Sequence, residues 1–453
     1  MTRATVRRGG TLGALLRLAG AVFVGQIAVI GFGVADTAML GRSADTAGLA
    51  TLALGQAIYI TLYVTLAESM QALLPVLARA HGEANPGRLR GVFGEGLWLA
   101  AALSLPGVAL LLWPQALLAL GGHADDARVL GYLRIQALAL PAALLFRAHV
   151  ALAQSIARPL LVTVLQLGAL LVKLALNALL LDPAAFGLHG AHGLGALGCA
   201  LATCATQWLL LGAAVLQHRG GPLRELAALR WRRPSMAGQW ELLRLGLPIG
   251  AAVLFEVSSF TGMALFIAHL GQRALAAHQI AASLASLLYM APLSLAIASS
   301  TLVAQRLGAG DHAGARHAAL RGVAAAVALG LLLTVLVGGA RGTIVALYTD
   351  DAAVGAIARH LLLFIAAYQV FDALQVCCAF ALRAWHVALL PSALYALGLW
   401  GGGLGGGYLL AFDPLHRVPA ALHGPAGFWA GNGAGLALTA LCLLALLLRV
   451  SRR

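Results

Sequence analysis

Three carboxylates lie inside long apolar stretches of the sequence, where an ionised group is costly. Asp36 lies in VFVGQIAVIGFGVADTAML, Glu256 in GLPIGAAVLFEVSSFTGMALFIA and Asp372 in LLLFIAAYQVFDALQVCCAFAL. An ionised Asp at the centre of a bilayer costs about 2.5–3.5 kcal/mol on insertion scales, so such a residue normally faces a bundle interior or a wet cavity. Intramembrane carboxylates mark cation or proton pathways, and these three predict a transporter. A structural ion pair is the alternative for each.

Further polar side chains lie near Glu256 and Asp372 without a reason to face lipid. Tyr368 and Asp372 are four residues apart and share one face of a helix. The other members are Gln369, Gln375, Ser258, Ser259, His278 and Gln279. Together they predict a shared polar pocket. Two alternatives stay open: Tyr368 as a packing aromatic, and His278 at the outer water interface.

The first half of the chain has its own polar residues inside apolar segments. Glu68 lies beside Gln71, and either a structural hydrogen bond or a place in a cavity would explain it. Lys173, the only lysine in the chain, lies four residues before Asn177. We expect its ammonium to neutralise a carboxylate of this half.

The composition excludes an ordinary soluble domain. Of 453 residues, 61% are hydrophobic and 10% are charged, whereas soluble domains have roughly 25% charged residues. The net charge of +14 comes almost entirely from arginines between apolar segments, which indicates a lipid bilayer as partner and no nucleic acid. The five cysteines form no C-x-x-C pair, so neither a zinc site nor another cofactor is expected.

Apolar runs of about 20 residues predict an all-α integral membrane protein with about twelve transmembrane helices. The runs are 14–40, 47–78, 92–113, 129–153, 160–181, 191–216, 243–270, 274–306, 318–348, 356–383, 389–411 and 425–449. The runs 47–78 and 274–306 exceed the bilayer thickness and should tilt, bend or project from it. The Gly-rich run LGLWGGGLGGGYLL at 397–410 predicts close helix packing or local flexibility.

An internal repeat divides the chain into halves. Four pairs recur at one separation: Tyr63 and Tyr289, Ala78 and Ala304, Gly82 and Gly308, Arg90 and Arg316. Six spans separate the copies, so the repeat is parallel, related by a pseudo-two-fold axis along the membrane normal. We predict an N-terminal six-helix lobe at 1–216, a basic cytoplasmic linker at 217–242 and a C-terminal six-helix lobe at 243–453, with a cleft between the lobes.

The arginines predict the orientation. With a cytoplasmic N-terminus, the inner side carries Arg158, Arg316, the arginines of 217–242 and the terminal RVSRR, while the outer loops are poorer in arginine. Cytoplasmic loops are enriched in basic residues, so both termini should be cytoplasmic. We expect a multi-pass protein of a bacterial inner membrane.

Several stretches resemble the multidrug and toxic compound extrusion (MATE) family in its NorM-like branch. They are 245–310, from LGLPIGAAVLFEVSS to LVAQRLGAG, the element YQVFDALQVCCAFALRAW, the element VADTAMLGR and GALGCALATCATQW at 195–208. The resemblance implies a secondary antiporter that exports organic, often cationic, drugs or metabolites in exchange for Na⁺ or H⁺. A monomer should suffice, because the repeat supplies both halves of the pathway.

The resemblance also implies site residues. The coupling cation would bind Glu256, Asp372 and Tyr368, with Na⁺ possible at the two carboxylates. Asp36 matches the family's helix-1 Asp, as an N-lobe relay or substrate carboxylate. Asn177 matches the first of two polar residues on the fifth helix, but Leu181 occupies the second position and Asp182 is one residue out of register.

Two alternatives to an antiporter are open. A flippase for lipid-linked sugars shares the broad architecture, but it should have a more cationic cavity for phosphate. An intramembrane lipid-modifying enzyme would need a nucleophile, metal or acid–base constellation. The sequence contains no H-E-x-x-H and no phosphate-binding Gly loop, so we expect a transporter and no enzyme.

Overall fold

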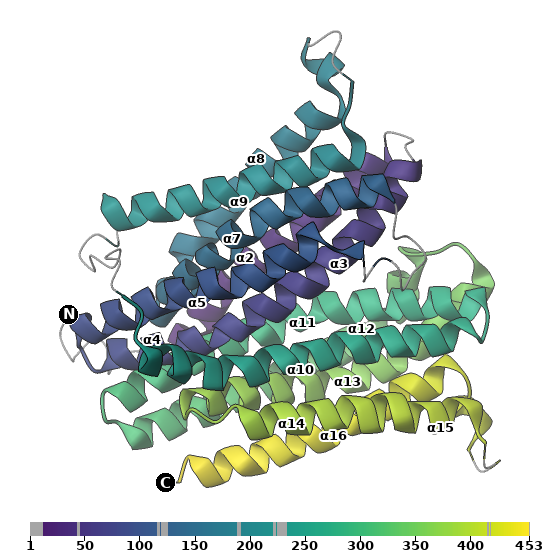
Figure 1. Ribbon diagram of the computed structural model, residues 1–453. Helices are drawn as coiled ribbons and strands as arrows, with labels where there is room; N and C mark the ends of the chain where they lie inside the picture. Colours follow the sequence, from purple (N-terminus) through teal and green to yellow (C-terminus); the bar gives the residue numbers. More distant parts are fainter. Residues whose placement is uncertain are drawn as a thin grey trace. The chain divides into compact units, whose positions relative to one another are not determined.

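The computed structural model describes residues 12–42, 46–115, 118, 126–187, 192–220, 223, 233–414, 416 and 418–452, and all regular elements in them are helices (Figure 1). Eleven of these helices are long and apolar enough to cross a membrane. The protein is therefore a multi-pass, all-α membrane protein, as predicted.

The helices fall into two halves in chain order. The first half contains α2 (Leu12–Gly41), α3 (Thr46–Ser69), η1 (Met70–Ala72), α4 (Leu73–Gly82), α5 (Pro86–Leu112), α7 (Ala127–Ser155), α8 (Leu160–Leu181), η2 (Pro183–Phe186) and α9 (Gly195–Arg219). The second half contains α10 (Met236–Ala268), α11 (Gln272–Gly308), α12 (His312–Ala346), α13 (Ala352–Ala384), α14 (Leu389–Leu397), η4 (Gly398–Gly406), α15 (Gly407–Phe412), η5 (Ala420–Leu422) and α16 (Pro425–Val450).

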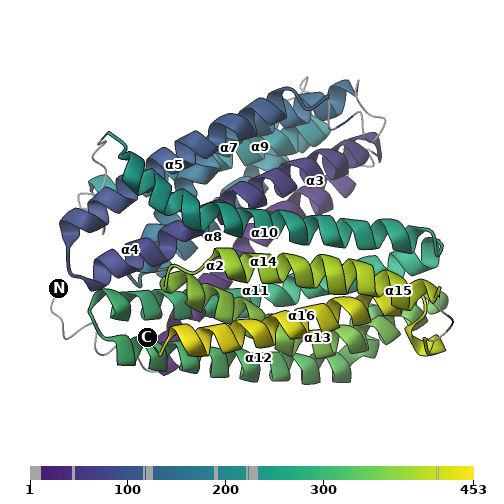
Figure 2. The same cartoon turned by 60° about the horizontal axis from the view of Figure 1, so that its bottom comes forward.

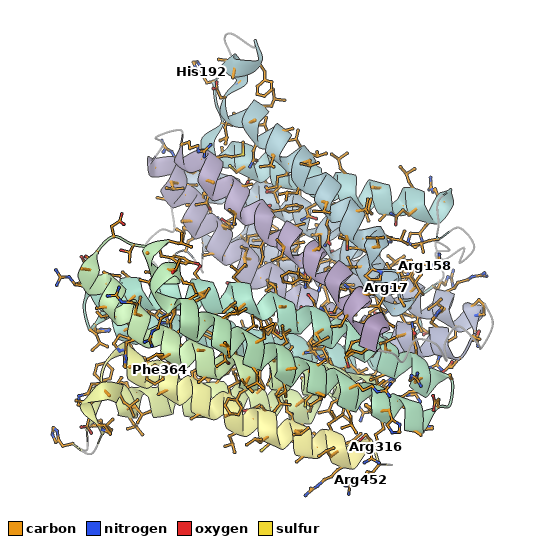
Figure 3. The ribbon with its side chains drawn as sticks, turned by 180° about the vertical axis from the view of Figure 1, so that it is seen from behind. Arg17, Arg158, His192, Arg316, Phe364 and Arg452 are labelled. Atoms are coloured by element: carbon orange, nitrogen blue, oxygen red, sulfur yellow. The ribbon has the colours of Figure 1, made fainter. Side chains whose placement is uncertain are left out.

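The chain folds into two compact units. The first unit is Ala21–Gly246, and the second unit is Leu247–Arg453 together with Met1–Gly20. Of the predicted linker 217–242, residues 221–222 and 224–232 lie outside the described residues. In the second unit, Arg316 and Arg452 lie at the same end of the helices (Figure 3). In the first unit, Arg158 lies at the opposite end from His192.

Corresponding helices of the two units begin with the same capping geometry. Asn85 accepts a hydrogen bond from the Arg88 backbone N–H at 3.0 Å, and Asp311 accepts one from Gly314 at 2.8 Å. Asp126 and Asp351 likewise cap α7 and α13, each accepting from the backbone N–H groups two and three residues on. The N–H groups of Val354 and Ala353 lower the pKa of the exposed Asp351, because they stabilise its carboxylate. The repeat therefore extends to the residues that start the helices.

The first of the two long predicted spans, 47–78, changes helix type near its C-terminal end. The 3₁₀ helix η1 separates α3 from α4, and Pro75 follows in the first turn of α4. Because Pro75 has no N–H, it cannot donate to the carbonyl of Gln71, and a short 3₁₀ segment accommodates the missing bond. The corresponding span in the second unit is the continuous helix α11, with an internal Pro292.

The predicted span 389–411 consists of three consecutive segments. The middle one, η4, is a π-helix and mostly glycine. Figure 2 shows α14 and α15 running along α16, and glycines of the two sides meet there. A Cβ at Gly435 would lie 2.2 Å from the Gly398 carbonyl oxygen, and one at Gly402 would lie 2.6 Å from the Gly435 Cα. The predicted close packing is confirmed, since only hydrogen fits at this contact.

Replacing Gly435 by alanine should destabilise the second unit, because its methyl group overlaps the Gly398 carbonyl. Overpacking of this kind costs about 1–3 kcal/mol, and we expect a lower melting temperature of the detergent-solubilised protein. Gly433→Ala is the matched control on the same helix, because no heavy atom lies within 4 Å of its Cβ position. Equal melting temperatures for the two variants would contradict the packing assigned here.

Candidate functional site

In the first unit, helices α2, α8 and α9 bring a carboxylate and an ammonium group together. The Nζ of Lys173 lies 2.9 Å from Oδ1 of Asp36, and Asn177 donates to the same oxygen at 2.7 Å. Lys173 also donates to the hydroxyl of Thr203, which itself donates to the Cys199 carbonyl at 2.9 Å. The predicted neutralisation by Lys173 is confirmed, and its partner is Asp36.

This ion pair is removed from the surface. The exposed fraction is 0% for Lys173 and 3% for Asp36. The Phe32 ring lies beside the ammonium, with 6.0 Å from Nζ to the ring centroid. A buried pair is stable only when further hydrogen bonds satisfy both groups, and Asn177 and Thr203 supply them. The cluster is therefore held by polar contacts across three helices.

The fifth transmembrane helix does not provide the second polar residue that the resemblance implies. Leu181 is the last residue of α8. Asp182 follows it, is exposed, and accepts a hydrogen bond from the Ala185 N–H at the start of η2. The second polar contact of Asp36 comes instead from Lys173, one turn before Asn177, and Thr203 on α9 accepts a hydrogen bond from Lys173. Thr203 was missed in the sequence because a threonine in a transmembrane helix commonly bonds its own backbone.

Glu68 belongs to a different contact in the first unit. Its Oε1 lies 3.6 Å from Nη2 of Arg147 and accepts a hydrogen bond from Gln71 at 3.2 Å. Both charged side chains are largely buried. The structural hydrogen-bond role considered for Glu68 is present, and the contact links α3 to α7.

In the second unit, α10 and α13 bring the other two carboxylates into electrostatic range. Asp372 is 3% exposed, Tyr368 is buried one turn before it, and Glu256 is partly buried. The charge of Glu256 acts on both Asp372 and Tyr368. Tyr395 on α14 interacts with both carboxylates as well. Glu256 on α10 and Tyr395 on α14 are thus within electrostatic range of Asp372 and Tyr368, which lie one turn apart on α13.

Aromatic packing holds these residues. The Trp429 ring on α16 contacts Tyr368 edge-on at 6.3 Å between centroids and contacts His278 at 5.8 Å. Ser259 donates to the Leu399 carbonyl at 3.1 Å, which fixes α10 to η4. These contacts orient the helices that carry Glu256 and Asp372.

The remaining predicted residues lie in different environments. His278 is 2% exposed and packs on Trp429, so the alternative that placed it at the outer water interface is wrong. This contact joins α11, which carries His278, to α16, which carries Trp429. Gln375 is buried, whereas Gln279 is exposed. Tyr395 and Trp429 were missed, because an aromatic residue in an apolar segment cannot be distinguished from a lipid-facing one.

Two helical units that bury carboxylates inside apolar helices are typical of a polytopic membrane transporter. The MatE family model matches residues 21–179 and 248–409, and the chain belongs to this family. Membership confirms the resemblance to MATE proteins and their NorM-like branch, and it makes the chain a transporter and not an enzyme.

Two bacterial relatives are similar over nearly their whole length. The probable multidrug resistance protein NorM of Aromatoleum aromaticum is 37% identical over 453 residues, covering 97% of this chain and 94% of that protein. The multidrug resistance protein PmpM of Pseudomonas aeruginosa is 33% identical over 445 residues, covering 97% and 91%.

Solved structures share the fold at lower identity. The eukaryotic MATE transporter AtDTX14 superposes with a TM-score of 0.83 at 20% identity, covering 97% of this chain and 96% of that one. An outward-facing multidrug resistance MATE transporter gives 0.85 at 15% identity, covering 97% and 95%.

Removing the ammonium of Lys173 should destabilise the first unit more than removing both charges. Breaking a buried pair from one side costs about 3–5 kcal/mol, because the remaining charge is uncompensated. We expect Lys173→Met to lower the melting temperature at low Na⁺, and Asp36→Asn with Lys173→Met to recover most of the loss. A double variant as unstable as the sum of both single variants would exclude the coupling.

Proposed function

We propose that the protein is a secondary active antiporter that exports organic, mainly cationic, drugs or toxic metabolites in exchange for Na⁺ or H⁺. The observation that carries this proposal is the buried Asp372 under the charge of Glu256 in the second unit. The names of the NorM and PmpM relatives, both multidrug resistance proteins, support drug export. The coupling site is Glu256, Asp372 and Tyr368.

Exchange follows from competition for negative charge. A carboxylate in a dry environment is stable when a proton, a Na⁺ ion or a cationic drug neutralises it. If the coupling ion and the drug favour different states of an alternating-access cycle, an inward ion gradient drives the drug outward. The membrane potential adds about 2.3 kcal/mol per charge per 100 mV. The phenol of Tyr368 can supply a neutral oxygen to a hard cation.

We place the protein in the bacterial inner membrane as a monomer with both termini cytoplasmic. No cofactor is needed beyond the coupling ion. A flippase for lipid-linked sugars is the less favoured reading, because phosphate recognition needs free cationic groups. Lys173, the fully buried ammonium, is already neutralised by Asp36.

Asp372→Asn should reduce export of a fluorescent cationic dye at least tenfold, because the amide cannot carry the exchanged charge. Glu256→Gln should have the same direction of effect. Efflux is measured in transporter-deficient cells and in proteoliposomes with Na⁺ and pH gradients imposed separately. Asp350→Asn is the matched control, since this exposed carboxylate lies between α12 and α13 of the same unit.

Gradient-driven efflux by Asp372→Asn at the wild-type rate would overturn the assignment of the coupling site. An equal loss of dye efflux in the Asp350→Asn control would mean that the effect arises from surface charge and not from the buried site. Dependence on only one of the two gradients identifies the coupling ion.

A further inference from the structure

The position beside Asp36 that an exchangeable cation would take is held by the ammonium of Lys173. One carboxylate oxygen, Oδ1, accepts both from Lys173 at 2.9 Å and from Asn177 at 2.7 Å. The ammonium in turn has the Thr203 hydroxyl and the Phe32 ring as neighbours. Asp36, Thr203 and Phe32 all belong to the first unit.

A Na⁺ ion at Asp36 would therefore meet a positive charge that is already in place. Two unit cations about 4 Å apart at an effective dielectric constant of about 20 repel each other enough to weaken binding roughly a thousandfold. Displacing Lys173 would leave its ammonium buried without a counter-charge, because the side chain is 0% exposed.

We propose that Lys173 is the resident counter-cation of Asp36 and excludes Na⁺ from the first unit, so that a coupling ion binds in the second unit alone. This inference deepens the proposed function and rests on its cation coupling. Lys173 is then the residue that determines which of the two carboxylate sites can exchange ions.

The test measures equilibrium binding of radioactive Na⁺ to the purified full-length protein in detergent. Glu256→Gln with Asp372→Asn forms the background, since it removes the carboxylates of the second cluster. This background should bind no Na⁺ above an empty-detergent control. Adding Lys173→Met should create saturable binding, and adding Asp36→Asn as well should abolish it.

Two outcomes would overturn the proposal. Saturable Na⁺ binding in the background, lost on Asp36→Asn, would mean that Na⁺ reaches Asp36 beside Lys173. Absence of binding in a folded Lys173→Met variant would mean that another group excludes the ion. If Lys173→Met does not fold, the background and its Asp36→Asn derivative still test the proposal, because both keep Lys173. Na⁺ binding that is lost on Asp36→Asn would overturn it.

The binding assay separates this proposal from the coupling site. It needs no transport, so dye efflux that survives Asp372→Asn would remove the coupling-site assignment and leave the Na⁺ result intact. Conversely, Na⁺ binding at Asp36 would remove the exclusion by Lys173 and leave the efflux result intact.

Discussion

The cost of a charge in an apolar interior determines the arrangement of both units. In the first unit, this cost is offset by groups of the unit itself. Asp36 and Lys173 neutralise each other, and Asn177 and Thr203 supply the hydrogen bonds that water would otherwise provide. The second unit instead gathers Asp372, Glu256 and phenols of Tyr368 and Tyr395. A cluster of acids needs positive charge or protons from outside, and this is the property that ion exchange requires.

The two clusters are unequal although the chain repeats itself. The separation that relates Tyr63 to Tyr289 relates Phe146 to Asp372 and Asp36 to Gly262. Phe146 lies in an apolar core cluster of the first unit, and Gly262 packs against Leu404 in the second. The repeat thus preserves the helices and their caps, while the polar residues differ. Backbone capping depends on local residues, so it survives such divergence, whereas a buried polar cluster needs side chains from several helices at once.

The sequence predicts the helices well, because they follow from local hydropathy. The three carboxylates stand out in it for the same reason, since each interrupts an apolar segment. Asp372 is conspicuous in LLLFIAAYQVFDALQVCCAFAL since nothing in an apolar segment accounts for its charge. The partners of these acids are harder to predict. Thr203 and Trp429 lie far along the chain from Lys173 and Tyr368, and their residue types are common in membrane helices. The alternative that placed His278 at the outer water interface is wrong, because helix packing buries this residue.

Electrostatic asymmetry also limits how the exchange can work. In the proposed cycle, a cationic drug and a coupling ion compete for the negative charge of Glu256 and Asp372, and full occupation by either leaves little attraction for the other. A second exchangeable acid in the first unit would weaken this competition, because the drug could stay bound there while the ion entered. In the proposed cycle, neutralisation of Asp36 by Lys173 closes that alternative and ties release of the drug to uptake of the ion at one cluster.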